Sequence, residues 1–190
     1  MNDILIKNFN IAGLYLIKPK IYSDVRGYFF ESYNKNKYKK INIKTNFVQD
    51  DHSFSKKNVL RGIHFQYKRP QAQLIYLVKG KIYLVLVDFR PKSKTFLKHI
   101  SLILDAKMHY QIYMPPGVGS GFYSLAKENH LIYKISEIYR GDKNEIGVFW
   151  KDKDLNIKWP CKKPLISIKD KDNIMIKDIN FKKYKDLLKL

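Results

Sequence analysis

Residues 74–87 read LIYLVKGKIYLVLV, two apolar runs on either side of Lys79-Gly80. In the second run, residues 82–87, both alternate sets of side chains are apolar, so a strand formed there would be buried on both faces. Such burial is expected inside a sandwich or where subunits pair. We therefore predict strands over residues 74–78 and 82–87, joined by a hairpin turn at Lys79-Gly80.

Short β-rich runs with turn residues between them recur along most of the chain. The remaining predicted strands cover residues 13–17, 27–33, 63–66, 100–104, 110–114, 121–125 and 131–136. No internal repeat or low-complexity linker divides the sequence, so we expect a single domain over residues 1–190. Nine or ten short strands in one domain predict an all-β fold, a jelly roll or a related barrel.

Two segments break the β pattern. Residues 35–44 hold five lysines and no acidic residue, which predicts a short helix or a solvated loop. Residues 178–190 have apolar side chains at helix-like spacing after a possible N-cap, Asp178, and predict a short C-terminal helical segment that packs across the barrel. These apolar side chains are Phe181, Tyr184, Leu187 and Leu188.

The chain of 190 residues carries 37 Lys+Arg against 17 Asp+Glu, a formal net charge of +20. A nucleic-acid binder, a membrane-surface protein and an enzyme with a polyphosphate-bearing substrate would each use this charge, while AT-rich coding would produce it without a function. A hydrophobic content of 45% excludes a disordered basic tail. The lysines are scattered and no zinc-finger, RNP-like or helix-turn-helix pattern accompanies them, so we expect no nucleic-acid partner.

No segment resembles a targeting or membrane-spanning sequence. The apolar stretch at residues 11–17 is only seven residues long and runs into Lys18-Pro19-Lys20, whereas a spanning helix needs about 18 apolar residues. The single cysteine, Cys161, excludes an internal disulfide framework. We therefore expect a soluble, cytoplasmic protein with no membrane partner.

Residues 60–66, LRGIHFQ, place Arg61 and His64 three apart across a glycine in a predicted strand. Burial of either side chain without a partner costs several kcal/mol. One interpretation is a pocket in which Arg61 binds an anion and His64 acts as a base, and the alternative is a structural histidine with its own partners. Tyr133, in another predicted strand, would on its own be a core aromatic residue.

Other common catalytic patterns are absent from the sequence. The five histidines form no H-x-H or H-E-x-x-H pair, so we expect no metal site. There is no P-loop or Rossmann glycine pattern and no G-x-S-x-G elbow.

An ordered set of motifs carries a more specific signal. The motifs are DVRGYFFE (24–31), QDDHS (49–53), LRGIHFQ (60–66), QA (71–72), VDFR (87–90), PPGVGSGF (115–122), YKISEIY (133–139), Asp152 before IKWP (157–160) and LISIKD (165–170). This set resembles the dTDP-4-dehydrorhamnose 3,5-epimerase family over about residues 10–172. The resemblance implies a cupin-type jelly roll that uses no metal and no other cofactor.

The resemblance also implies a substrate, a nucleotide-diphosphate 4-keto sugar in which a carbon next to the keto group is inverted through an enolate. Removal of that proton needs a base poised near neutral pH. By the family's pattern, His64 is this base, Asp170 is its dyad partner and Tyr133 donates a proton on the opposite face of the sugar ring. The positions that match substrate contacts are Arg26, Phe29, Glu31, Gln49, Arg61, Gln73, Ser120, Tyr139 and Lys169. Since Phe29 and Glu31 match positions supplied partly by a neighbouring subunit, a symmetric homodimer is expected.

Three positions depart from the family's pattern, because Gln73, Leu84 and Ser120 stand where it has lysine, aspartate and histidine. The missing lysine removes an electrostatic stabiliser of the enolate oxygen. We expect the base and the donor to persist while the sugar is handled differently. Inversion at C3, at C5 or at both, a heptose substrate, another nucleotide, 3,4-ketoisomerisation and non-catalytic binding all stay open. A place in capsule or lipopolysaccharide biosynthesis is implied by the family alone.

Overall fold

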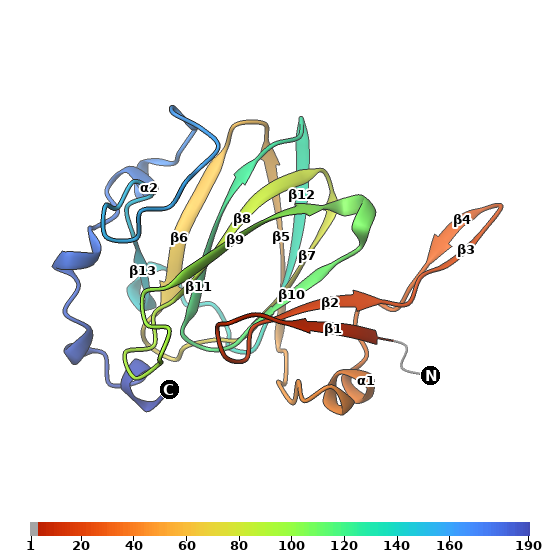
Figure 1. Cartoon of the computed structure of the whole chain (residues 1–190), viewed down its shortest axis with the longest axis horizontal. Helices are drawn as coiled ribbons and strands as arrows, with labels where there is room; N and C mark the ends of the chain where they lie inside the picture. Colours follow the sequence, from red (N-terminus) through yellow and green to blue (C-terminus); the bar gives the residue numbers. More distant parts are fainter. Residues whose placement is uncertain (1–3) are drawn as a thin grey trace.

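Two antiparallel β-sheets face each other, and a two-stranded hairpin projects from one end of the molecule (Figure 1). The computed structural model describes residues 4–190, apart from the side chain of Asp142, so the first three residues of the expected domain lie outside it. The six-stranded sheet has the order β1 (Ile4–Asn8), β2 (Tyr15–Pro19), β10 (Gln111–Met114), β7 (Gln73–Lys79), β12 (Glu128–Ile135), β5 (Gln49–Lys56). The five-stranded sheet has the order β13 (Glu145–Gly147), β6 (Leu60–Gln66), β11 (Val118–Ser124), β8 (Lys81–Asp88), β9 (His99–Asp105). The hairpin consists of β3 (Tyr22–Asp24) and β4 (Gly27–Phe29), and the predicted all-β jelly-roll class is confirmed.

The predicted hairpin at Lys79-Gly80 is wrong, although both strands exist. Strand β7 belongs to the six-stranded sheet and β8 to the five-stranded sheet, so the chain changes sheet at Gly80. Gly80 has a φ of 100°, and a Cβ there would lie 2.6 Å from Oδ1 of Asn129. A glycine is therefore required because the chain turns sharply against β12. A glycine between two apolar runs is thus compatible with a corner between two sheets as well as with a hairpin.

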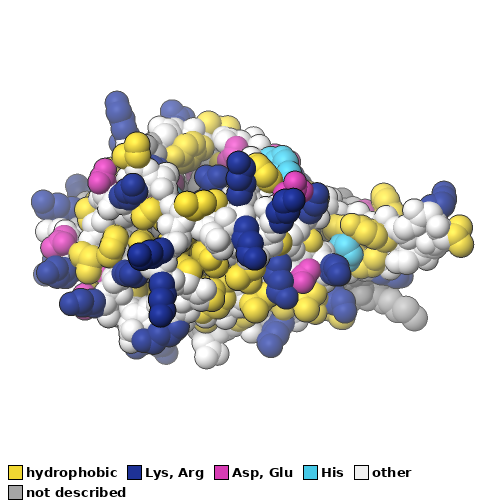
Figure 2. Space-filling model, turned by 90° about the horizontal axis from the view of Figure 1, so that it is seen from above, with side chains coloured by type: hydrophobic (Ala, Val, Ile, Leu, Met, Phe, Trp, Pro, Cys, Tyr) yellow, Lys and Arg dark blue, Asp and Glu magenta, His cyan; other side chains and the backbone are white. Residues whose placement is uncertain are grey.

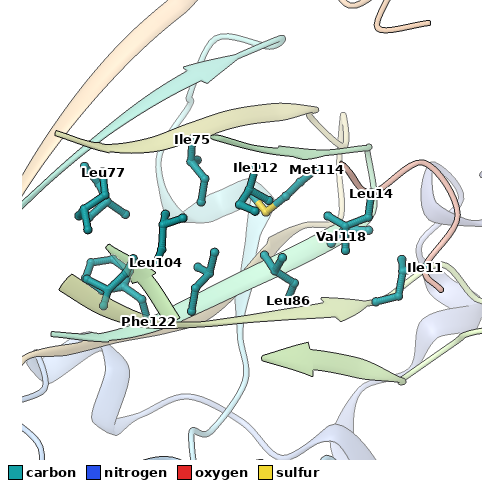
Figure 3. Close-up of a cluster of buried hydrophobic side chains, with 13 residues drawn as sticks. Ile11, Leu14, Ile75, Leu77, Leu86, Leu104, Ile112, Met114, Val118 and Phe122 are labelled. Carbon is teal, nitrogen blue, oxygen red and sulfur yellow. The ribbon is translucent and has the colours of Figure 1, made fainter. Parts of the chain in front are cut away.

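Strand β8 is buried on both faces, as predicted. Ile82, Leu84 and Leu86 contribute to the core between the sheets, where Figure 3 labels Leu86. Val85 and Val87 point the other way, into a second cluster that contains residues from the C-terminal segment. Both alternate sets of β8 are thus apolar because each face of this central strand is covered.

The C-terminal segment is not one continuous helix. It forms three 3₁₀ turns, η3 (Ile176–Asp178), η4 (Phe181–Lys183) and η5 (Leu187–Lys189). Asp178 ends the first turn, and it is Asn180 whose side chain caps the second. The apolar residues at 181, 184 and 187 are spaced by three, which suits the three residues per turn of a 3₁₀ helix better than an α-helix. The segment packs on the outer face of the five-stranded sheet, which agrees with the expected packing across the barrel.

A short α-helix, α1 (Lys35–Lys40), forms in the lysine-rich segment. The side chain of Asn34 caps it by accepting hydrogen bonds from two backbone N–H groups. Its single buried residue, Tyr38, packs with Ile17 and Leu74 on the outer face of the six-stranded sheet. Within residues 4–190, no helix has the length and apolar character needed to cross a bilayer.

Candidate functional site

A cavity of about 400 Å³ opens between the two sheets. Strands β5, β7 and β12 line it from one sheet and β6, β11 and β13 from the other, with α2 (Ile168–Lys171) beside them. The predicted site residues that line it are Arg61, His64, Gln73, Ser120, Tyr133, Tyr139, Lys169 and Asp170. The fold thus brings together residues that are more than a hundred positions apart in the sequence.

A β-bulge explains how Arg61 and His64 both face this cavity. Residues three apart on a regular strand point to opposite faces. Here Phe122 of β11 pairs with Arg61 and Ser120 pairs with His64, so two steps on β11 match three on β6. Gly62 allows the close approach, since a Cβ on it would lie 2.6 Å from the backbone oxygen of Ser120.

The imidazole of His64 is held by a carboxylate. Its Nε2 lies 2.6 Å from Oδ1 of Asp170, and because a carboxylate only accepts, Nε2 carries the proton of this hydrogen bond. Asp170 lies in the first turn of α2, where its backbone N–H donates to the side chain of Ser167, and it also accepts from Asn173. Burial alone would raise the pKa of Asp170, but the hydrogen bond from His64 and the interaction with its charge, with smaller contributions from the side chains of Ser167 and Asn173, hold the pKa below its usual value. The dyad therefore leaves Nδ1 of His64 as the nitrogen available to take a proton.

Glu145 is a residue of this site that sequence reasoning missed. Its Oε1 lies 3.8 Å from Nδ1 of His64 and accepts from Nζ of Lys169 at 2.6 Å, while Oε2 accepts from Gln66 at 3.1 Å. Its strand, β13, has only three residues and no alternation that could be recognised in advance. Only the pairing of β13 with β6 places Glu145 beside His64. The second nitrogen of the imidazole thus also faces a carboxylate, and Lys169 compensates its charge.

Tyr133 lines the cavity from β12, in the sheet opposite to that of His64. Its hydroxyl lies 3.3 Å from that of Ser53. Burial raises the pKa of the Tyr133 phenol, and the Ser53 hydrogen bond and the charge of Arg61 offset part of that shift. Tyr133 therefore keeps its proton at neutral pH.

The three departures from the family's pattern occupy different places. Gln73 and Ser120 line the cavity, one from each sheet, and bring neutral groups to it. Leu84 is 1% exposed in the core between the sheets, where it lies opposite Phe122 of β11. Its apolar side chain adds to the packing under the cavity and does not line it.

The rim of the cavity holds a cation and a glutamine. Arg61 donates from Nε to the hydroxyl of Ser55 at 2.9 Å and from Nη2 to the backbone oxygen of Phe54 at 3.1 Å. The side chain of Gln49 accepts a hydrogen bond from the backbone N–H of Tyr139 at 3.0 Å. Tyr139 lines the cavity, whereas Gln49 does not. These bonds orient the rim groups before any ligand binds.

Three predicted site residues lie away from the cavity. Arg26 and Phe29 belong to the projecting β3–β4 hairpin, which we call the arm, and both are exposed. The guanidinium of Arg26 pairs with the carboxylate of Asp24, 2.6 Å away at its closest. Glu31 follows the arm and pairs with Lys37 of α1. Within one chain, the fold therefore does not bring these residues to the cavity.

Among the residues that the structure describes, no three His, Cys, Asp or Glu side chains are grouped so that they could hold a metal ion. The cationic side chains are spread over the surface rather than gathered into one patch on the face seen in Figure 2. Among the described residues that line the cavity, the lysine and arginine side chains are Arg61 and Lys169, and Lys169 pairs with Glu145.

Comparison with known proteins gives a consistent result. A family-level profile described as dTDP-4-dehydrorhamnose 3,5-epimerase matches residues 8–178. The dTDP-4-dehydrorhamnose 3,5-epimerase of Shigella flexneri is 39% identical over 162 residues, which cover 84% of this chain and 89% of that protein. The crystal structure of a dTDP-6-deoxy-D-glucose-3,5-epimerase from Legionella pneumophila Philadelphia 1, in complex with dTDP-4-keto-L-rhamnose, has a TM-score of 0.89 at 34% identity over 97% of each chain. A 3′-monoepimerase from Streptomyces bikiniensis, in complex with dTDP-quinovose, has a TM-score of 0.81 at 30% identity over 88% of this chain and 85% of that one.

Proposed function

Since the chain belongs to the dTDP-4-dehydrorhamnose 3,5-epimerase family, we propose that it inverts a carbon next to the keto group of a nucleotide-diphosphate 4-keto sugar. The observation that carries this proposal is the placement of His64 and Tyr133 in one cavity, on opposite sheets. Inversion requires a base on one face of the sugar ring and an acid on the other. The carboxylate-bound imidazole supplies the first and the protonated phenol supplies the second.

In the proposed reaction, Nδ1 of His64 takes the proton from the carbon next to the keto group. The electron pair of that C–H bond moves toward the keto oxygen and forms an enolate. Asp170 stabilises the imidazolium through Nε2. The hydroxyl of Tyr133 then gives its proton to the opposite face of the same carbon, the carbonyl re-forms, and exchange with water resets both groups. The net reaction inverts one centre and consumes no cofactor.

In this chain we assign the stabilisation of the enolate oxygen to neutral groups. The amide of Gln73 and the hydroxyl of Ser120 line the cavity and can donate hydrogen bonds. A neutral donor stabilises a developing oxyanion less than an ammonium group does. We therefore propose that Gln73 and Ser120 bind the sugar and its developing charge, with a smaller electrostatic contribution than the family's lysine would make.

The diphosphate has two cations within reach of the cavity. Arg61 is held at the rim with its guanidinium already oriented, and Lys169 lies beside Glu145. We assign both to the diphosphate, with Gln49 and Tyr139 at the same rim contacting the substrate. The formal charge of +20 favours the approach of an anionic substrate, and salt should weaken this attraction.

We further propose a homodimer in which the arm completes the cavity of a second copy. Three apolar or aromatic side chains of the arm, Val25, Tyr28 and Phe29, have exposed fractions of 104%, 59% and 68%. A two-stranded hairpin is also only marginally stable when it stands alone in water. A surface of this kind is stabilised when another molecule covers it. Arg26 and Phe29 of one copy would then meet the nucleotide bound by the other, with Glu31 at the root of the arm.

A second function, inversion of a single centre, has specific support. The 3′-monoepimerase from Streptomyces bikiniensis shares this fold at 30% identity. 3,4-Ketoisomerisation and non-catalytic binding remain alternatives that the same experiment tests. We place the reaction in the cytoplasm, because nucleotide sugars are made there from nucleoside triphosphates.

Incubation of the protein with a dTDP-linked 4-keto-6-deoxy sugar in D₂O, read by NMR, tests the proposal. Deuterium at both C3 and C5 identifies a 3,5-epimerase, and deuterium at one centre identifies a monoepimerase. Movement of the keto group to C3 would identify a ketoisomerase. The absence of exchange with the dTDP-linked, UDP-linked and GDP-linked sugars, alongside measurable binding of any of them, would identify a non-catalytic binder.

A further inference from the structure

His109 lies in the turn between β9 and β10, directly after η1 (Ala106–Met108), and contacts the arm and the residue that follows it. The centroid of its ring is 4.4 Å from that of Tyr28 and 5.4 Å from that of Phe30. Its backbone is left-handed, with a φ of 53°, and its N–H donates to the oxygen of Ala106 at 3.1 Å. The position of His109 is therefore set by the body of the molecule, while its ring meets the arm.

The two faces of the arm carry different side chains. In its register Tyr22 lies opposite Phe29, and Ser23 lies opposite Tyr28. Successive residues of a strand point to opposite faces, so the face bearing Tyr28 turns toward His109 and the face bearing Phe29 points away from it. The contact with His109 thus holds one face and leaves the other available.

Other side chains of the arm contact its own residues or its base, where Tyr22 borders a small pocket with Lys37 and Tyr38 of α1. Asp24 and Arg26 pair with each other near its tip, and Nζ of Lys20 lies 5.0 Å from the centre of the Tyr22 ring. Over residues 4–190, the ring-to-ring contacts that join residues 22–30 to the rest of the chain all involve His109. Through the rings of Tyr28 and Phe30, His109 therefore ties one face of the arm to the body of the molecule.

We propose that His109 is a positioning residue, which sets the angle at which the arm presents Phe29 and Arg26 to the cavity of a second copy. The inference rests on the proposed function, because it assumes that the arm completes a partner's site. A loose arm would have to be ordered at each binding event, and this lost freedom weakens both substrate binding and subunit association. The effect should appear in binding and leave the proton transfers in the cavity unchanged.

Two substitutions distinguish the effect of the His109 ring from that of its backbone conformation. His109→Asn removes the ring and tolerates the left-handed backbone, whereas His109→Phe keeps an aromatic ring. Loss of the ring contacts in His109→Asn should raise KM for the 4-keto sugar nucleotide about fivefold to tenfold with kcat unchanged, and His109→Phe should restore the wild-type KM. His99→Ala, at the far end of β9, is the matched control and should leave both constants unchanged.

The dimer dissociation constant, from sedimentation, provides a readout that needs no substrate. It should rise by a similar factor in His109→Asn and return in His109→Phe. An Asn variant with wild-type KM and wild-type dimer affinity would overturn the inference, and so would a fall in kcat at constant KM or a wild-type protein that stays monomeric. If wild-type protein exchanges no deuterium, the proposed function fails, while the dimer measurement still decides the role of His109.

Discussion

The cavity and the arm hold two parts of the same proposed site under opposite physical conditions. In the cavity, His64 and Asp170 are fixed 2.6 Å apart by strands and a helix cap, and the relative exposure of the Asp170 side chain is 5%. On the arm, the side chain of Arg26 is 86% exposed and its partner, Asp24, is on the arm as well. Proton transfer needs groups that are already oriented, and one chain supplies them. Contacts to the nucleotide can form on an exposed ribbon because a second copy can cover it, so substitutions of the proton-transfer groups in the cavity should act on kcat and those in the arm on KM.

The largest effect should come from His64→Asn. An amide can keep a hydrogen bond to Asp170 but cannot take a proton from carbon, so we expect kcat to fall about 10²- to 10⁴-fold with little change in KM. Deuterium incorporation from D₂O, followed by NMR, should fall equally. Exchange at the wild-type rate would show that another group is the base and would remove the basis of the comparison between cavity and arm.

Tyr133→Phe should separate the two proton transfers. His64 can still remove and return its proton on one face, so exchange with D₂O should continue while formation of the inverted product falls about 10²-fold or more. NMR of the same sample measures both quantities. Product formation at the wild-type rate would assign the donor to a different residue, and equal loss of exchange and product would mean that Tyr133 also assists the first step.

Asp170→Asn should have a smaller effect on kcat, about tenfold to a hundredfold, because the base remains but loses its charged partner. The substitution should also change how the free energy of unfolding depends on pH. Since the pKa of Asp170 is held below its unfolded value, its contribution to stability is present above about pH 4 and is lost as the pH falls through the lower folded value. Urea unfolding should therefore show a less stable variant at pH 7 and little difference from wild type near pH 2. A difference that is the same at both pH values would contradict the assigned ionisation.

The placement of Arg61 and His64 in a cavity could be predicted from sequence because their signal is local. Arg61 and His64 in one strand-like run cannot both be ordinary core residues, and their ordered neighbours match a family pattern. The burial of β8 on both faces was equally local, since it can be read from residues 82–87. The partner of each strand is a long-range property, so the local sequence at Gly80 predicts a hairpin although the chain passes there from one sheet to the other.

Glu145 and the arm show why the rest could not be predicted. Glu145 lies beside His64 only because a three-residue strand pairs with β6 across about eighty residues of sequence. The sequence of residues 27–33 predicts one strand, whereas the strand in the structure covers only residues 27–29 and pairs in a two-stranded ribbon with β3. Alternation indicates which side chains share a face but not whether that face meets the core, solvent or another molecule.

Of the four substitutions that compare the cavity with the arm, Phe29→Ala should have the smallest effect, a roughly tenfold rise in KM with kcat unchanged, because it removes an aromatic surface for the nucleobase and no reacting group. A mixture of His64→Asn and Phe29→Ala subunits tests whether the arm acts on its own cavity or on its partner's. If it acts on the partner's, the mixed dimer holds one cavity with an intact His64 from one chain and an intact Phe29 from the other, and part of the activity returns to the wild-type KM. If the arm acts on its own cavity, each cavity of the mixed dimer keeps one defect and KM stays high. Recovery after mixing would thus show that the cavity and the arm of one chain belong to two different sites.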